Sequence, residues 1–289
     1  MEVELVVNGH AVVGEGPAWD GQVGRLLWVD IIRGLVHLFD PDTRSDRSID
    51  VGQHVGAAAP RAAGGLVLAL RGGFGLLDIE SGSVEPMGDT EASNPANRMN
   101  DGKCDRAGRF WAGSMAYSET GNAGSLYRLD EDHSVVRVVG GVGLSNGLGW
   151  SPDDRVMYHI DSLADTVYAY DFDAESGSLF NRRPLIEVPE GQGTPDGMTV
   201  DSEGCLWVAF WGGSAIRRYE PEGSLLQEVR LPVRQVSSCA FGGPDQGDLY
   251  ITTAARGLSG RELEEQPHAG GLFRCRPGVS GPPAYAYVD

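Results

Sequence analysis

Short apolar runs alternate with turns rich in glycine and aspartate along the whole chain, a pattern typical of β-strands rather than helices. One class of run is centred on a large hydrophobic residue, and its centres recur at steps of 40, 43, 47, 49 and 43 residues. A repeat of about 40 to 50 residues that contains several strands is typical of a β-propeller blade. The six centres are Trp28, Leu68, Trp111, Tyr158, Trp207 and Tyr250.

Each centre has the neighbours that a four-stranded blade requires. A turn such as Asp105–Gly108 or Asp201–Gly204 precedes it, and another apolar strand follows it, as Gly124–Asp130 does in the third repeat. A weaker strand such as Leu226–Leu231 comes last, as the outer edges of blades usually do. The strand Val3–Val7 near the amino terminus is expected to complete the last blade and so to close the ring.

The sequence therefore predicts an all-β, six-bladed β-propeller with four-stranded blades and a metal site in its central channel, in which residues 1–289 form a single domain. The 42 glycines and 16 prolines suit many short strands joined by turns. Only Gly260–Gln266 has the pattern of a short helix. The four cysteines are widely spaced and include no C-x-x-C pair, so we expect buried free thiols rather than zinc ligands or disulfides.

The charge of the chain limits its partners. A formal net charge of −18 disfavours binding to nucleic acid and to anionic lipid. The segment Met1–His10 lacks the basic start and apolar run of a signal peptide, and no apolar stretch approaches the length that spans a bilayer. We expect a cytoplasmic protein that is a monomer or a weak homo-oligomer and acts on a small molecule.

The innermost strand of each blade lines the central channel of a propeller, so equivalent positions of the repeats should face the axis at similar depth. Eleven to thirteen residues before the strand centres, four of the six repeats carry a side chain with an oxygen ligand. The other two repeats offer Val55–Ala57 and Ser238–Cys239 at this level. The four oxygen-bearing residues are Glu15, Asn100, Asn146 and Asp196.

Two interpretations of these four residues compete. Taken singly, Asn146-Gly147 and Asp196-Gly197 are ordinary turn dipeptides. Taken together, they share one offset inside the repeat rather than lying beside the hairpins, and Glu15 fits no turn preference. Carboxylate and amide oxygens around one axis are the ligands that a hard divalent cation prefers. The repeats therefore favour a metal site on the channel axis.

The stretch Asn97–Lys103 adds polar chemistry at the same level of the third repeat. Side chains alternate between the two faces of a strand, so Arg98 and Asn100 should point into one site and Met99 should point away from it. His54 lies near the empty channel position of the second repeat and is expected to pack or to reach the surface rather than to act on a substrate. The chain contains no phosphate loop, HExxH or G-x-S-x-G motif.

Five motifs in register along nearly the whole chain resemble one known family. They are Gly14-Glu15-Gly16-Pro17, Asn97–Lys103, Leu144–Leu148, Tyr158–Ser162 and Thr194–Met198. Together they are similar to the SMP-30/gluconolactonase family, also called regucalcin-like or luciferin-regenerating-enzyme-like, and to its bacterial sugar lactonases in particular. Its members are six-bladed propellers with one divalent cation on the channel axis, and most characterised ones hydrolyse sugar lactones.

The resemblance implies a role for each candidate residue. Glu15, Asn146 and Asp196 would be the metal ligands, and Asp196 would also be the catalytic acid and base. Arg98 and Asn100 would hold the substrate, and Asp101, next in the same stretch, is included in the predicted substrate-binding set. The cofactor would be one divalent cation, with Ca²⁺ as the first expectation and Zn²⁺, Mg²⁺, Mn²⁺ or Fe²⁺ as alternatives.

The sequence departs from the family pattern in one place. Vertebrate members follow a Gly-Thr-Met-Ala segment with an acidic pair, one member of which contacts the sugar. Here Gly113–Ala116 leads into Tyr117-Ser118, with Glu119 one place later, so the preferred sugar cannot be carried over. The segment Phe210–Gly213 is similar to bacterial aldonolactonases of pentose and hexose catabolism.

These observations predict a metal-dependent lactonase that opens a sugar lactone, such as gluconolactone or a pentonolactone, to the aldonic acid. Two alternatives stay open. A cation polarises a P=O bond as readily as a C=O bond, so the same site would serve a phosphotriesterase of the organophosphate-hydrolysing kind. The protein could also be a calcium-binding propeller without catalytic activity, although such a scaffold has no reason to place Arg98 and Asn100 together facing the channel.

Overall fold

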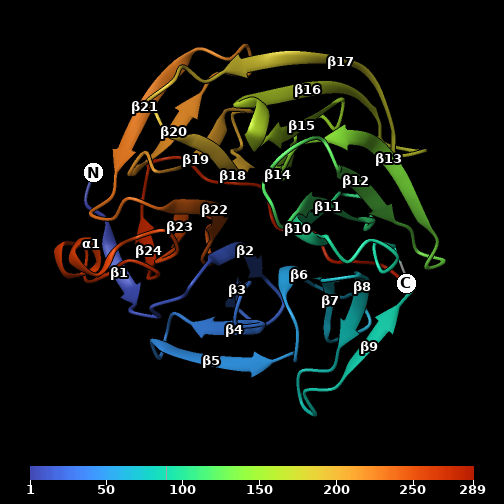
Figure 1. Cartoon of the computed structure of the whole chain (residues 1–289), viewed down its shortest axis with the longest axis horizontal. Coiled ribbons are helices and arrows are strands. Elements are labelled where there is room, and N and C mark those ends of the chain that lie inside the picture. The colour runs from blue at the N-terminus through green and yellow to red at the C-terminus, as the bar shows by residue number, and fades with distance from the viewer. Residues whose placement is uncertain (89) are drawn as a thin grey trace.

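A computed structural model of the chain, which describes residues 1–88 and 90–289, contains six four-stranded antiparallel sheets around a central axis (Figure 1). The predicted six-bladed all-β propeller with four-stranded blades is therefore confirmed. We number the blades 1 to 6 in the order of their innermost strands.

The strands of the first three blades follow one another along the chain from the axis outward. They are β2 (Gly14–Asp20), β3 (Arg25–Asp30), β4 (Leu35–Asp40) and β5 (Ser45–Asp50) in blade 1; β6 (Val55–Pro60), β7 (Leu66–Leu70), β8 (Gly73–Leu77) and β9 (Val84–Met87) in blade 2; and β10 (Asn97–Cys104), β11 (Phe110–Ala116), β12 (Gly124–Leu129) and β13 (Val135–Val142) in blade 3.

Blades 4 and 5 repeat this order, and blade 6 takes its outermost strand from the amino terminus. The strands are β14 (Ser145–Trp150), β15 (Val156–Asp161), β16 (Thr166–Asp173) and β17 (Ser178–Glu187) in blade 4; β18 (Thr194–Val200), β19 (Leu206–Trp211), β20 (Ala215–Tyr219) and β21 (Leu225–Arg230) in blade 5; and β22 (Val236–Gly242), β23 (Asp248–Thr253), β24 (Leu272–Cys275) and β1 (Glu4–Val7) in blade 6.

The ring is closed by the strand that the sequence predicted. β1 pairs antiparallel with β24, with Glu4 opposite Arg274 and Leu5 opposite Phe273. The Arg274 guanidinium also donates to the Glu4 carboxylate over 2.7 Å. Because the first strand completes the last blade, the two ends of the repeat array are joined in one sheet and no inner edge is left open.

The predicted strand centres are buried, and their preceding turns help to hold them. The Trp111 indole Nε1 donates to Asp105 Oδ2 over 2.9 Å, and Trp207 Nε1 donates to Asp201 Oδ2 over the same distance. Asp105 and Asp201 are themselves buried. A buried indole N–H needs an acceptor, and in blades 3 and 5 the turn aspartate six positions earlier provides it.

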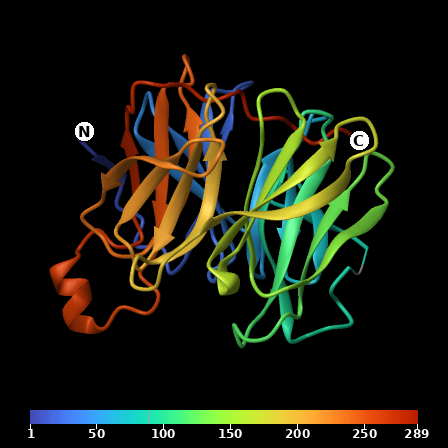
Figure 2. The same ribbon diagram turned by 90° about the horizontal axis from the view of Figure 1, so that it is seen from above.

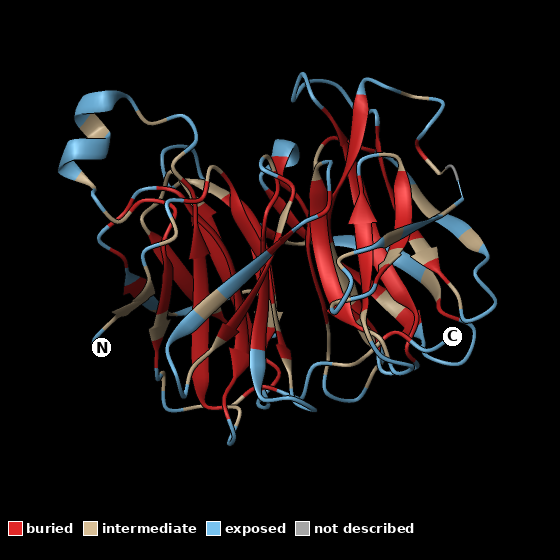
Figure 3. Ribbon diagram, turned by 90° about the horizontal axis from the view of Figure 1, so that it is seen from below, coloured by how far each residue is buried: buried red, intermediate tan, exposed pale blue. Residues whose placement is uncertain are grey.

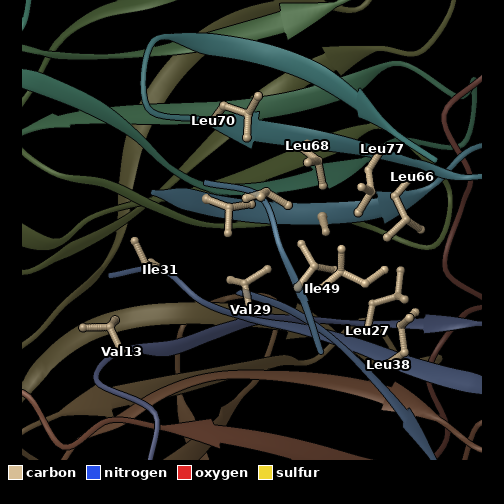
Figure 4. Close-up of a cluster of buried hydrophobic side chains, with 14 residues drawn as sticks. Val13, Leu27, Val29, Ile31, Leu38, Ile49, Leu66, Leu68, Leu70 and Leu77 are labelled. Atoms are coloured by element: carbon tan, nitrogen blue, oxygen red, sulfur yellow. The ribbon is translucent and has the colours of Figure 1, made fainter. Parts of the chain in front are cut away.

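Neighbouring blades pack face to face through aliphatic side chains. Figure 4 shows the contact between blades 1 and 2, where Leu27 and Val29 of β3 meet Leu66 and Leu68 of β7. Each such side chain contributes about 1.5 to 3 kcal/mol on full burial. The innermost strands contain no exposed residue, whereas the outer strands carry most of the exposed strand residues (Figure 3). The blades are thus wedges that share their cores with both neighbours.

Every innermost strand carries one residue more than its partner strand at the same level. Between the pairs Met99–Ser114 and Gly102–Ala112, for example, β10 has three steps where β11 has two. The same one-residue excess occurs in β2, β6, β14, β18 and β22. A β-bulge bends the strand and redirects side chains. The oxygen-bearing positions predicted from the repeat lie in these bulges or, for Glu15, directly before one.

Regular helix is restricted to two short segments of the described chain. The predicted helical segment forms α1 (Gly260–Glu265), which begins with a capping box between Ser259 and Glu262 and projects from one end of the ring (Figure 2). A 3₁₀ turn, η1 (Ser162–Ala164), follows β15. Over residues 1–88 and 90–289, no helix has both the length and the apolar character needed to cross a membrane.

The four cysteines also follow the prediction. All of them are buried free thiols, and burial raises the pKa of each thiol. They contribute to packing as small apolar side chains.

Candidate active site

The channel has a cavity at each end. The axial cavity, of about 310 Å³, is lined by the amino-terminal parts of β2, β10, β14 and β18 together with loops at that end of the ring. The opposite cavity, of about 230 Å³, is lined by the carboxyl-terminal parts of the innermost strands and by residues 282–285. Of the predicted site residues, the axial cavity brings together Glu15, Arg98, Asn100, Asn146 and Asp196.

Glu15 is placed by the bulge in blade 1. Gly16 adopts a left-handed φ of 53°, which glycine allows without steric cost, and its N–H donates to Glu15 Oε2 over 2.8 Å. Burial raises the pKa of Glu15 well above its usual value, and the nearby carboxylates of Asp196 and Asp101 raise it further. The carboxylate therefore lies in a site that disfavours its own negative charge.

Asp196 faces the same cavity from blade 5. Burial is the main cause of its strongly raised pKa, followed by the charge of Asp101. The Asn146 amide Nδ2 donates to Asp196 Oδ1 and also to the Ser162 hydroxyl, the latter over 3.0 Å. Ser162 Oγ in turn donates to the Pro195 carbonyl over 2.6 Å. Ser162 thus ties the end of β15 to the strand that carries Asp196.

Arg98 and Asn100 face the cavity together, whereas Met99 lies in the core between blades 2 and 3, as the strand pattern predicted. Arg98 Nη1 donates to Asn100 Oδ1 over 2.6 Å and to the Met99 carbonyl over 2.9 Å. Burial lowers the pKa of Arg98 to about 10, so its guanidinium is still protonated at neutral pH. Among the described residues its charge is not paired with a carboxylate.

Asn100 connects this arginine to the rest of the site. Its amide Nδ2 donates to the Ser145 carbonyl over 2.9 Å and to Asn146 Oδ1 over 3.3 Å. The result is one chain of hydrogen bonds from Arg98 through Asn100 and Asn146 to Asp196. The three strands β10, β14 and β18 are therefore held in fixed relation at the cavity.

Behind Ser145 lies a buried histidine that the sequence pattern did not single out. His159 Nε2 and Ser145 Oγ are 2.7 Å apart, and His159 is only 1% exposed. Burial lowers the pKa of His159 to about 3, with Arg182 as a smaller cause. The imidazole is therefore neutral at all pH values near physiological ones, and it supports the strand that carries Asn146 rather than reaching the cavity.

We expect this histidine to make the fold acid-sensitive. An unfolded histidine binds a proton near pH 6.5 and the folded one only near pH 3, so the stability present above pH 6.5 is lost as the pH falls. Between pH 6.5 and 4.5 this group alone should lower the free energy of unfolding by about 2 to 3 kcal/mol. Urea unfolding of the wild type and of His159→Gln at both pH values measures the difference. Equal losses in the two proteins would contradict the prediction.

The donor set at the axial cavity is suited to a cation but does not close a site by itself. Over residues 1–88 and 90–289, no three His, Cys, Asp or Glu side chains are grouped to hold a metal ion. Glu15 and Asp196 supply two carboxylates, and no lysine, arginine or histidine of the described chain forms an ion pair with either. A third ligand would be the Asn146 amide oxygen, for which the amide must turn so that Oδ1 rather than Nδ2 lies beside Asp196.

Two buried carboxylates without a compensating cation are energetically unfavourable. Their raised pKa values express this cost. A hard divalent cation would remove it, since carboxylate and amide oxygens are its preferred ligands. The residues present therefore fit a divalent cation in chemistry.

Two residues named in the sequence analysis, Asp101 and His54, lie outside the axial cavity lining. Asp101 lines the opposite cavity rather than the axial one, and its Oδ1 accepts the Gly102 N–H over 2.8 Å. Alternation from Arg98 and Asn100 also puts Asp101 on the other face of the strand. His54 pairs with the Tyr117 hydroxyl over 2.9 Å and is not part of the axial cavity lining. Glu119 does line that cavity.

The sequence of the chain matches a known protein family over most of its length. The model of the family described as the SMP-30/Gluconolactonase/LRE-like region matches residues 13–255. The chain belongs to this family. The prediction made from the five motifs is therefore confirmed.

Relatives within the SMP-30/gluconolactonase family match the chain over nearly its full length. It is 42% identical over 292 residues to regucalcin of Danio rerio, covering 100% of this chain and 99% of that protein. It is 39% identical to a Bacillus subtilis (strain 168) protein named "Putative sugar lactone lactonase YvrE", covering 96% and 95%. The solved structure of a calcium-binding protein, regucalcin, from Agrobacterium tumefaciens str. C58 is 25% identical with a TM-score of 0.95, covering 99% and 97%.

Proposed function

We propose that the protein is a metal-dependent hydrolase that opens a sugar lactone to its aldonic acid in the axial cavity. The observation that carries the proposal is the pair of buried carboxylates, Glu15 and Asp196, beside the amides of Asn100 and Asn146. The guanidinium of Arg98, which forms no ion pair with residues 1–88 or 90–289, lines the same cavity. Membership of a family that includes proteins named as sugar lactonases agrees with it.

The proposed cation ligands are Glu15, Asn146 and Asp196. Ca²⁺ is the first candidate, because the ligands are hard oxygens and a related structure is named as a calcium-binding protein. Such an ion, when bound, supplies Lewis-acid polarisation of a carbonyl group and lowers the pKa of water.

The chain's own residues would do the rest. Arg98 is held by a hydrogen bond to Asn100, so its remaining N–H groups would donate to the carbonyl and hydroxyl groups of a lactone, and Asn100 Oδ1 would accept from a hydroxyl group of the same ligand. Asp196 would accept the proton of the attacking water and return it to the ring oxygen as the ester opens. Asp101 lines the opposite cavity, so we assign it an effect through charge on Glu15 and Asp196 rather than a contact with substrate.

A matrix of metals against substrates tests this assignment. Protein stripped with a chelator serves as the blank, and Ca²⁺, Zn²⁺, Mg²⁺, Mn²⁺ and Fe²⁺ are added back singly. Each form is assayed on a gluconolactone, a pentonolactone and a phosphotriester. We expect lactone hydrolysis that is lost on stripping and restored by metal, with a slower phosphotriester reaction.

Two outcomes of the matrix would replace the proposal. Faster turnover of the phosphotriester than of both lactones would make the protein a phosphotriesterase. Metal binding by calorimetry without hydrolysis of any substrate would favour the non-catalytic calcium-binding propeller.

A further inference from the structure

An ion pair crosses the mouth of the axial cavity. Glu119 follows β11 in blade 3, Arg256 follows β23 in blade 6, and these blades lie on opposite sides of the ring (Figure 1). Arg256 Nη2 and Glu119 Oε1 are 2.9 Å apart, and both residues line the cavity that contains Arg98 and Asp196. At the entrance to the candidate active site, a guanidinium is therefore paired with a carboxylate of the chain itself.

Two guanidiniums, those of Arg98 and Arg256, line this cavity in a protein whose formal net charge is −18, and a cation held by Glu15 and Asp196 would offset the two carboxylates that are not paired with an arginine. The pKa of His54 is lowered by burial first and then by the charges of Arg98, Arg71 and Arg256. Arg98 uses only Nη1 for hydrogen bonds within the described chain, so its remaining N–H groups are available to a ligand. The guanidiniums of Arg98 and Arg256, which both line the cavity, would therefore attract a ligand that carries a carboxylate.

The Arg256–Glu119 ion pair can be replaced by an ion pair between Arg256 and a ligand at low cost. The two side chains are 42% and 45% exposed, and exposed ion pairs contribute only about 0.2 to 1 kcal/mol. A ligand that brings its own carboxylate to Arg256 replaces one carboxylate partner with another, so the guanidinium remains paired. A neutral ligand must either leave the pair intact or separate it without compensation.

From this exchange we infer that Arg256 is a specificity-determining residue that selects lactones bearing a free carboxylate. When no substrate is bound, the Glu119 carboxylate occupies the position beside Arg256 that the substrate carboxylate would take. The inference rests on the proposed lactonase function and names its substrate class: the lactone of a sugar diacid or of another carboxylated sugar. A six-carbon lactone has a size appropriate to a cavity of about 310 Å³.

The test compares two substrates that differ at one carbon. D-glucono-1,4-lactone has a hydroxymethyl group at C6, and D-glucaro-1,4-lactone has a carboxylate there. The quantity measured is the ratio of kcat/KM for the charged lactone to that for the neutral one, in the metal-loaded enzyme. We expect a wild-type ratio above about ten, which corresponds to about 1.4 kcal/mol.

Two variants should move this ratio in opposite directions. Arg256→Gln removes the charged partner and should lower the ratio about tenfold, mainly through KM of the charged lactone. Glu119→Gln removes the competing carboxylate and should raise the ratio roughly threefold. The matched control is Arg234→Gln, which removes a similarly exposed arginine paired with Glu262 over 3.1 Å outside the cavity, and it should leave the ratio unchanged.

A binding measurement separates this inference from the proposed function. Calorimetric titration with glucarate, gluconate and glucitol should give the tightest binding for the dianion glucarate, and Arg256→Gln should weaken that binding about tenfold. Hydrolysis of both lactones with equal ratios in wild type and Arg256→Gln would overturn the inference while leaving the lactonase proposal intact. Preferential glucarate binding without hydrolysis of any lactone would overturn the proposed function but support the carboxylate site.

Discussion

Asp196→Asn is expected to reduce kcat for lactone hydrolysis by at least about a thousandfold, since acid–base groups contribute about 10²- to 10⁴-fold and this residue is also a proposed metal ligand. Asparagine has nearly the same shape but cannot accept the proton of an attacking water. The substitution also removes a buried charge whose raised pKa shows that the fold disfavours it. Asp196→Ala should likewise abolish turnover without unfolding the protein.

The measurement pairs steady-state kinetics with thermal unfolding, so that a loss of activity is not mistaken for a loss of structure. The matched control is Asp101→Asn, which neutralises another buried carboxylate that lines the opposite cavity. It should change kcat by less than about tenfold, because Asp101 acts on the site only through charge. Wild-type activity in Asp196→Asn would remove Asp196 from the mechanism.

Much of the architecture could be predicted because the same strand and turn patterns recur in each repeat of the sequence. The strand centres needed only the recurrence of a large hydrophobic residue behind a turn, and the turn aspartates Asp105 and Asp201 turned out to hold the indoles that they precede. The closing strand was predicted at Val3–Val7 because a circular array must close its edge, and the structure has it at Glu4–Val7. Periodic hydrophobic burial is a property that sequence expresses directly.

The candidate site was predictable where it follows the repeat and not where it departs from it. Glu15, Asn146 and Asp196 share one offset, and they do face one cavity. Asp101 was included in the substrate-binding set only through its place in the stretch Asn97–Lys103, and it lines the opposite cavity. Glu119 and Arg256 meet only through loops from blades on opposite sides of the ring, and no pattern in the chain links residues 137 positions apart.

Ser162 shows an intermediate case. It lies in a motif that carried the family resemblance, Tyr158–Ser162, but its type gave no reason to place it at the site. Its hydroxyl joins the Asn146 amide to the Pro195 carbonyl, which only the packing of β15 against β18 brings together. Residues that position other residues have no distinctive chemistry, so sequence alone rarely identifies them.

The second large effect concerns stability. In metal-free protein at pH 8, Glu15→Gln should raise the free energy of unfolding by about 1 to 3 kcal/mol, the usual cost of burying a polar group without an adequate partner. Glu15 is 4% exposed, and burial together with Asp196 and Asp101 raises its pKa. Because the pKa of the folded carboxylate is raised, folding costs free energy only at pH values at which the carboxylate would otherwise be ionised. The penalty is absent below the unfolded pKa of about 4.5 and grows as the pH rises towards the folded value.

Two further expectations distinguish this electrostatic effect from a change in side-chain packing alone. The gain from Glu15→Gln in metal-free protein should be smaller at pH 5 than at pH 8, because the wild-type carboxylate is then more often protonated. Saturating Ca²⁺ should stabilise the wild type by about 2.7 kcal/mol at a hundredfold excess over Kd, and it should stabilise Glu15→Gln far less. Scanning calorimetry with chelator and with Ca²⁺ at both pH values measures all four differences.

Glu91→Gln is the matched control for this series. Glu91 is buried to a similar extent, at 6% exposed, but its carboxylate already accepts hydrogen bonds from Ser114 over 2.6 Å and Tyr127 over 2.9 Å. Replacing it leaves these hydroxyls with a poorer acceptor, so Glu91→Gln should lower stability with or without Ca²⁺. If Glu15→Gln behaved like Glu91→Gln, the Glu15 carboxylate would already be satisfied within the fold. The axial cavity would then have no electrostatic need for a cation.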